Sequence, residues 1–172
     1  EMDQAELDTR VRSVLLDVLA SQDRPISAAE RSRITQEISD DILGHGPIEE
    51  FLRDPEVSEV MVNGPASVWL ERNGRLVPTD ARFDDEDHLR RTIDKIVTRI
   101  GRRVDESSPL VDARLADGSR VNAVIPPLAI DGSALTIRKF SEDPLRVGDL
   151  VRFGSLTPRT AEFLDACVRG RL

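Results

Sequence analysis

The stretch LVDARLADGSRVNAVIPPLAIDGSALTIRKF, residues 110–140, decides the fold. Apolar and polar residues alternate along three short runs within it, and an Asp-Gly pair follows each of the first two runs. The runs are residues 110–115, 120–125 and 134–140. Alternation with a period of two is typical of strands with one buried face, and Asp117-Gly118 and Asp131-Gly132 are typical of the turns between strands. The stretch therefore predicts three strands of a sheet.

The residues before this stretch predict further strands and one long helix. Asn73-Gly74 is the strongest short signal for a hairpin, and it separates two runs rich in strand-forming residues. A third such run lies at residues 57–62. An acidic start at residues 84–87 then precedes apolar residues that recur at helical spacing as far as Gly101. We therefore predict an α+β sheet domain at about residues 55–141.

The first 54 residues predict a small helical bundle. Apolar spacing predicts a helix over residues 3–20, and Ser27 with Glu30 has the spacing of a capping box for a second helix that ends near Leu43. Pro47 suits the start of a short third helix. Acidic residues outnumber basic ones in this bundle, so its surface either faces a protein partner with basic loops or is simply solvated.

The last segment, residues 142–172, predicts a linker followed by a helix that begins at Thr157-Pro158. The segment shows no strands and no core of its own, so its helix needs another surface to pack on. We therefore expect the natural chain to continue beyond Leu172.

The composition argues against several classes of function. The 172 residues hold 24 Lys and Arg against 32 Asp and Glu, a formal net charge of -8, which disfavours a general nucleic-acid binder. No apolar run approaches the ~20 residues of a membrane helix, and residues 1–20 carry acids throughout, so we expect neither insertion into a membrane nor export. One cysteine and two histidines are too few for a zinc site, and no metal site is predicted.

Lysine is scarce, and its placement excludes a phosphate-binding loop of the Walker A type. Such a loop needs the pattern G-x-x-x-x-G-K-[ST], because its lysine reaches the phosphates that the loop amides surround. The chain has only Lys95, which follows Asp94, and Lys139, which follows Arg138. We therefore predict no catalytic residues in this chain and no enzymatic activity of the chain alone.

Arginines gather in one part of this acidic chain. Residues 99–139 hold seven basic and five acidic side chains, a local excess of positive charge. Arg120 follows a predicted turn and Arg138 lies near the end of a later strand, so the two guanidinium groups can converge on one anion if those strands pair. The alternative is that these arginines are solvated strand ends that pair with nearby acids.

Several of these segments together resemble a known family. They are GRRVDESSPLVDARLADGSRVN (101–122), IPP (125–127), LTIRKF (135–140), IEEFL (48–52) and VSEVMVNG (57–64). They are similar to the N-terminal domain of the type II and type IV secretion ATPases, a group that includes VirB11. Within that group the resemblance is to the Flp/Tad pilus-assembly ATPases known as CpaF or TadA, and it covers roughly residues 42–172.

The resemblance implies a PAS-like N-terminal domain that sits on a RecA-like motor domain in a hexameric ring. The motor domain, with its ATP, Mg²⁺ and Walker A loop, would begin shortly after Leu172. In this family two arginines of the N-terminal domain approach the nucleotide phosphates, and the matching positions here are Arg120 in Gly-Ser-Arg-Val and Arg138 in Thr-Ile-Arg-Lys.

The resemblance also implies a place in the cell and a partner. The intact protein would be cytoplasmic and would reach the inner membrane through a platform protein of the pilus or secretion machine. The alternative that stays open is a stand-alone adaptor without a nucleotide role, whose acidic bundle docks a partner.

Overall fold

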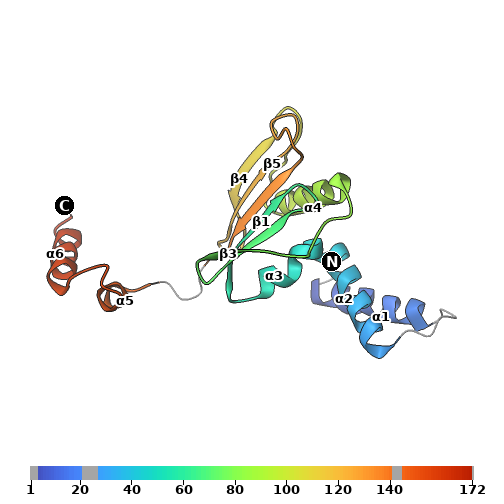
Figure 1. The fold of residues 1–172 in the computed structure, drawn as a ribbon, viewed down its shortest axis with the longest axis horizontal. Coiled ribbons are helices and arrows are strands. Elements are labelled where there is room, and N and C mark those ends of the chain that lie inside the picture. The colour runs from blue at the N-terminus through green and yellow to red at the C-terminus, as the bar shows by residue number, and fades with distance from the viewer. Residues whose placement is uncertain (1–3, 21–26, 141–144, 172) are drawn as a thin grey trace. The chain divides into compact units, whose positions relative to one another are not determined.

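The structure is a computed structural model that describes residues 4–20, 27–140 and 145–171 (Figure 1). The chain divides into two compact units, residues 1–140 and residues 141–172, and each is considered by itself. The helices and the sheet of the first unit form the α+β architecture that the sequence predicts. Because the bundle and the sheet belong to one compact unit, a domain boundary at residue 54 stays a prediction.

The first unit is built on a six-stranded antiparallel sheet. Its strands are β1 (Val57–Asn63), β2 (Val68–Arg72), β3 (Arg75–Pro78), β4 (Leu110–Arg114), β5 (Arg120–Val124) and β6 (Ala134–Arg138). Their order across the sheet is β3-β2-β1-β6-β5-β4, so the two predicted groups of strands meet where β1 pairs with β6. The pairing of β1 with β6 therefore joins parts of the chain that lie far apart in sequence.

The hairpin between β2 and β3 confirms the prediction made from Asn73-Gly74. Both residues have positive φ angles, 52° for Asn73 and 73° for Gly74. A two-residue turn with two positive φ angles has the twist that antiparallel strands require, and Asn-Gly adopts it at little cost.

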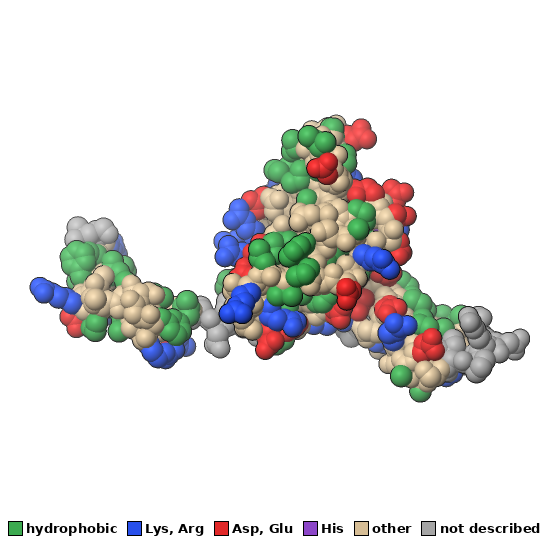
Figure 2. All heavy atoms as spheres, viewed as in Figure 1, with side chains coloured by type: hydrophobic (Ala, Val, Ile, Leu, Met, Phe, Trp, Pro, Cys, Tyr) green, Lys and Arg blue, Asp and Glu red, His purple; other side chains and the backbone are tan. Residues whose placement is uncertain are grey.

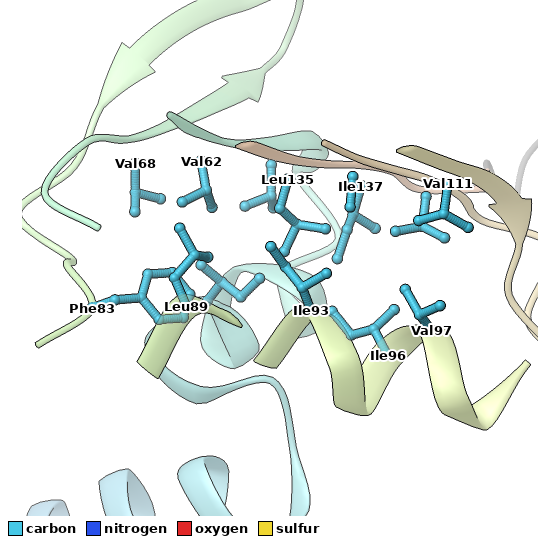
Figure 3. Close-up of a cluster of buried hydrophobic side chains, with 14 of the residues drawn as sticks. Val62, Val68, Phe83, Leu89, Ile93, Ile96, Val97, Val111, Leu135 and Ile137 are labelled. Carbon is cyan, nitrogen blue, oxygen red and sulfur yellow. The ribbon is translucent and has the colours of Figure 1, made fainter. Parts of the chain in front are cut away.

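One long helix, α4 (Glu86–Arg99), covers one face of the sheet (Figure 3). Asp85 caps its start by accepting a hydrogen bond from the His88 backbone amide at 2.7 Å, and Gly101 follows its end with a φ of 67°. The buried side chains labelled on α4 and the sheet are Val62, Val68, Leu89, Ile93, Ile96, Val97, Val111, Leu135 and Ile137. The core therefore lies between α4 and the inner face of the sheet.

The helices before the sheet pack in a different way. They are α1 (Gln4–Ala20), α2 (Ala28–Leu43), the 3-10 turn η1 (Gly46–Ile48) and α3 (Glu49–Arg53). The buried residues of α2 are polar: Thr35, Ser39 and Asp40. As predicted, Ser27 caps α2, and its Oγ accepts from the Glu30 amide at 3.2 Å. Among the described residues of these elements, Ile48 of η1 is buried in the hydrophobic core, and Phe51 and Leu52 of α3 pack against that core while partly buried.

The second unit contains α5 (Val147–Arg152) and α6 (Pro158–Arg169). The start of α6 at Thr157-Pro158 is as predicted, whereas nothing in the sequence pattern indicated α5. This helix has six residues, and its start is held by the Arg146 amide, which donates to Asp149 Oδ2 at 2.9 Å. Within residues 145–171 no side chain is fully buried, so the described helices present apolar side chains to solvent.

The surface is densely charged. Figure 2 shows acidic and basic side chains close together across the face in view, with hydrophobic side chains between them. Among the helices of the described residues, none has the length and apolar character needed to cross a membrane.

We predict that Ile93→Ala destabilises the first unit by about 2–5 kcal/mol, because it removes a fully buried side chain and leaves a cavity between α4 and the sheet. Thr98→Ala, on the exposed side of the same helix, should change the free energy of unfolding by less than about 0.5 kcal/mol. Urea denaturation followed by circular dichroism measures both. Equal effects of the two variants would contradict the placement of the core.

Candidate functional site

The face of the sheet turned away from α4 carries a row of three arginines. The register of the antiparallel strands sets Arg114 of β4 opposite Arg120 of β5, and Arg120 opposite Arg138 of β6. Residues directly opposite in an antiparallel pair point to the same side of the sheet, with Cβ atoms about 4.5–5.5 Å apart. All three side chains are exposed, while their neighbours Val121 and Ile137 are buried on the α4 side. The strands thus bring Arg120 and Arg138 together.

Sequence reasoning did not single out Arg114. The alternation in residues 110–115 contains the signal that would have found it, because Val111 is buried and Asp112 and Arg114 are exposed on the other face. A shallow hollow of about 300 Å³, lined by Asp112, Ala113, Arg114 and Arg120, lies at this end of the row.

Arg120 is held by a carboxylate on the next strand. Its Nε donates to Asp112 Oδ1 at 2.9 Å and its Nη2 donates to Asp112 Oδ2 at 2.6 Å. The guanidinium is 66% exposed and the carboxylate 41% exposed, so water and salt screen this pair and it adds little to stability. The pair orients the guanidinium of Arg120 along the sheet face.

The other two arginines of the row have no such partner. Within residues 4–20, 27–140 and 145–171, no ion pair involves Arg114 or Arg138. The neighbour of Arg138 on its other side is Glu59 of β1, which lies opposite it in register. The acids beside the row are Asp112 and Glu59, so the three arginines carry more positive charge than these two acids neutralise. Like charges directly opposite one another destabilise a sheet.

The ion pair changes the acidity of both partners. The hydrogen bonds from Arg120 lower the pKa of the Asp112 carboxyl group below its ordinary value, with the charge of Arg120 adding to the effect. The same contacts raise the pKa of Arg120. Arg120 therefore stays cationic, and Asp112 stays anionic to more acidic pH than an isolated aspartate.

Acids between α4 and β4 do not hold Arg120 or Arg138. Asp105 pairs with Arg103 at 3.3 Å, and its Oδ1 accepts from the backbone amides of Ser107 and Ser108. It therefore belongs to a local turn. In the described residues, no group of three or more His, Cys, Asp or Glu side chains is arranged to hold a metal ion.

Comparison with known proteins decides the family. Residues 41–172 match the family described as Type II/IV secretion system protein. The chain belongs to this family. The match confirms the resemblance to the N-terminal region of the type II and type IV secretion ATPases that the sequence motifs indicated.

Two relatives show how much of a longer protein this chain represents. It is 41% identical over 128 residues to an uncharacterised protein of Methanocaldococcus jannaschii, covering 73% of this chain and 18% of that protein. It is 30% identical over 129 residues to the type IV secretion system protein VirB11 of Brucella suis, covering 69% of this chain and 36% of VirB11. The chain therefore spans well under half the length of these relatives.

A solved structure supports the fold. The crystal structure of the VirB11 ATPase from the Brucella suis type IV secretion system, in complex with sulphate, matches with a TM-score of 0.56 at 27% sequence identity. The match covers 73% of this chain and 42% of the VirB11 chain. The helices and antiparallel sheet described above are thus similar to part of a secretion ATPase.

We predict that the carboxyl group of Asp112 titrates below the ordinary range for aspartate and that Arg120→Gln raises its pKa toward that range. The ion pair is complete above the ordinary pKa of the carboxyl group and is lost as pH falls through the lowered value. Carboxyl-detected NMR titration measures the pKa. Arg103→Gln serves as the control, because Arg103 pairs with Asp105 and not with Asp112. An equal rise of the Asp112 pKa in Arg103→Gln would contradict the assignment.

Proposed function

We propose that this chain is the nucleotide-facing N-terminal part of a secretion or pilus-assembly ATPase. Arg120 and Arg138 contribute positive charge to the phosphates of ATP bound on a RecA-like motor domain elsewhere in the intact protein. The observation that carries this proposal is their position directly opposite one another on β5 and β6, on an exposed sheet face. Family membership and the likeness to the VirB11 ATPase support it.

The chemistry of phosphoryl transfer favours arginine at such a position. Negative charge accumulates on the γ-phosphate oxygens in the transition state, and a planar, permanently charged guanidinium stabilises it through two parallel hydrogen bonds. Arg120 is already oriented by Asp112, so a phosphate would replace a carboxylate that binds the guanidinium in the same two-pronged way. Arg138 has no ion-pair partner in the described residues, so a phosphate would bind it without displacing a carboxylate.

The intact protein provides the setting for this role. We propose a homo-hexameric ring of the Flp/Tad subgroup that uses ATP and Mg²⁺ and lies in the cytoplasm. The approach of the arginines to the nucleotide would couple hydrolysis to movement of the N-terminal domain. The acidic helical bundle would face basic loops of an inner-membrane platform protein, so the ring would reach the membrane through that partner.

We predict that residues 1–172 alone release no phosphate from ATP above a buffer blank. The chain has no Walker A lysine to enclose the phosphates, and two arginines on an open sheet face with a shallow hollow supply charge without enclosing the nucleotide. A phosphate-release assay on the purified chain tests this. Release that saturates with ATP concentration would contradict it.

In the full-length protein that carries the motor domain, Arg120→Ala and Arg138→Ala should each lower ATP turnover by at least about tenfold, a conservative fraction of the 10³–10⁵-fold effect of arginine fingers in other NTPases. Arg120→Lys should stay impaired, because an ammonium group keeps the charge and loses the two-pronged geometry. Because both side chains are exposed, thermal midpoints should shift little.

The matched control is Arg75→Ala, an exposed arginine on β3 at the far edge of the same sheet. It should leave turnover unchanged. Wild-type turnover in both Arg120→Ala and Arg138→Ala, with the ring intact, would instead leave these arginines as solvated strand ends.

A further inference from the structure

A groove of about 680 Å³ opens among the helices of the first unit. Its walls are α2, the η1–α3 turn and the residues around the start of α4, and none of the three row arginines lines it. The lining residues that matter here are Ala29, Glu37, Asp41, Pro47, Glu50 and Asp84. The groove therefore draws together segments that lie up to some sixty residues apart in the chain.

The wall formed by α2 is fixed to α4 by two cations. Lys95 Nζ donates to the backbone carbonyl of Asp41 at 2.6 Å, and Arg99 Nη2 donates to that of Leu43 at 2.5 Å. The carbonyls at a helix C-terminus lack partners within the helix and carry partial negative charge, so cations there stabilise the helix end. Burial lowers the pKa of Lys95, and the charge of Arg99 lowers it further.

The floor of the groove is held at a close approach of the chain. Gly46 has a φ of 63°, and a Cβ at this position would lie 3.1 Å from Asp41 Oδ1 and 3.3 Å from His88 Nε2. Those two side-chain atoms are 3.4 Å apart, so α2 and α4 meet across Gly46. Only glycine combines this backbone conformation with the space available. The groove is therefore a structured feature of the unit.

The charges around the groove are unbalanced. Its lining contains five carboxylates against two guanidinium groups and His88, whose ring nitrogens lie 3.4 Å from Asp41 Oδ1 and from Asp84 Oδ2. One of these carboxylates, on Asp40, is matched by Arg53 of α3 at 2.8 Å. Three others are exposed and come from three different walls: Glu37 of α2, 63% exposed; Glu50 of α3; and Asp84, 89% exposed. Glu37 approaches Arg33 at only 3.8 Å and in water, which is a weak pairing.

We propose that this groove docks a short extended segment of a partner protein that carries arginine or lysine side chains. Carboxylates that converge from three walls of a cleft concentrate negative potential there and attract cationic side chains. The volume suits a few side chains, and Ala29 and Pro47 provide apolar contact for the stems of long cationic residues. The same potential repels nucleic acid and anionic lipid. The inference rests on the proposed function, which includes a basic protein partner, and it assigns a binding surface to that partner.

The test is direct binding of a probe peptide to the chain of residues 1–172, without nucleotide. An arginine–glycine repeat peptide should bind in a saturable, salt-sensitive manner, whereas the same peptide with citrulline in place of arginine should not bind. Fluorescence anisotropy measures both affinities. Because citrulline keeps the shape of arginine and removes its charge, the comparison isolates the electrostatic contribution.

Variants locate the binding surface. The double variant Glu50→Lys/Asp84→Lys should weaken binding of the arginine peptide at least about tenfold, since like charges placed together oppose association. Glu6→Lys/Asp17→Lys makes the same charge change at two exposed positions on α1 outside the groove, and should change the affinity less than about twofold. Circular dichroism checks folding, and Glu50→Gln/Asp84→Asn replaces the lysine pair if that pair unfolds.

Two results would overturn the proposal: equal binding of the citrulline peptide, or a loss with Glu6→Lys/Asp17→Lys as large as with Glu50→Lys/Asp84→Lys. The second result would indicate diffuse attraction to the acidic surface. Neither result bears on ATP turnover, which tests Arg120 and Arg138. Failure of the groove and failure of the nucleotide role are therefore separate outcomes.

Discussion

The packing of α4 on one face of the antiparallel sheet is the interaction on which the rest of the molecule depends. Leu89, Ile93 and Ile96 are buried in one hydrophobic cluster with the inner side chains of β1, β5 and β6. Because strand side chains alternate between faces, a slip of one residue in any of these strands would move its apolar residues to solvent and its charged residues into the core. Burial under α4 thus sets the register that aligns Arg114, Arg120 and Arg138 on the opposite face.

On the outer face of the sheet, like charges repel one another instead of stabilising the fold. Three cations lie side by side where a sheet selected only for stability would alternate the signs of its charges. Asp112 binds one of them, Arg120, through two hydrogen bonds, whereas no ion pair in the described residues involves Arg114 or Arg138. A rigid, apolar inner face allows such an arrangement, because the large free energy of core burial outweighs a modest repulsion between solvated side chains.

The helices at the N-terminal side are attached by polar contacts more than by apolar burial. The buried residues of α2 are Thr35, Ser39 and Asp40, and its C-terminal carbonyls receive Lys95 and Arg99 from α4. Glu49 joins the same region: burial favours its neutral form, but the hydrogen bond from His45 and the charges of His45 and Arg53 prevail and lower its pKa. Helix α4 therefore serves both sides of the unit, with an apolar face toward the sheet and a cationic face toward α2.

Local signals in the sequence were sufficient for most elements of the fold. Asn73-Gly74 determined a hairpin, Ser27 and Thr157 determined helix starts, and strand alternation indicated which side of β5 is buried, because turns, caps and periodicity act over a few residues. The family motifs singled out Arg120 and Arg138. Their position opposite one another, the Asp112 contact and the acidic groove were decided only in three dimensions. Each depends on strand register or helix docking between distant segments, which the free energy of the whole packed core determines. Helix α5 was not predicted because its six residues are too few to show a helical periodicity.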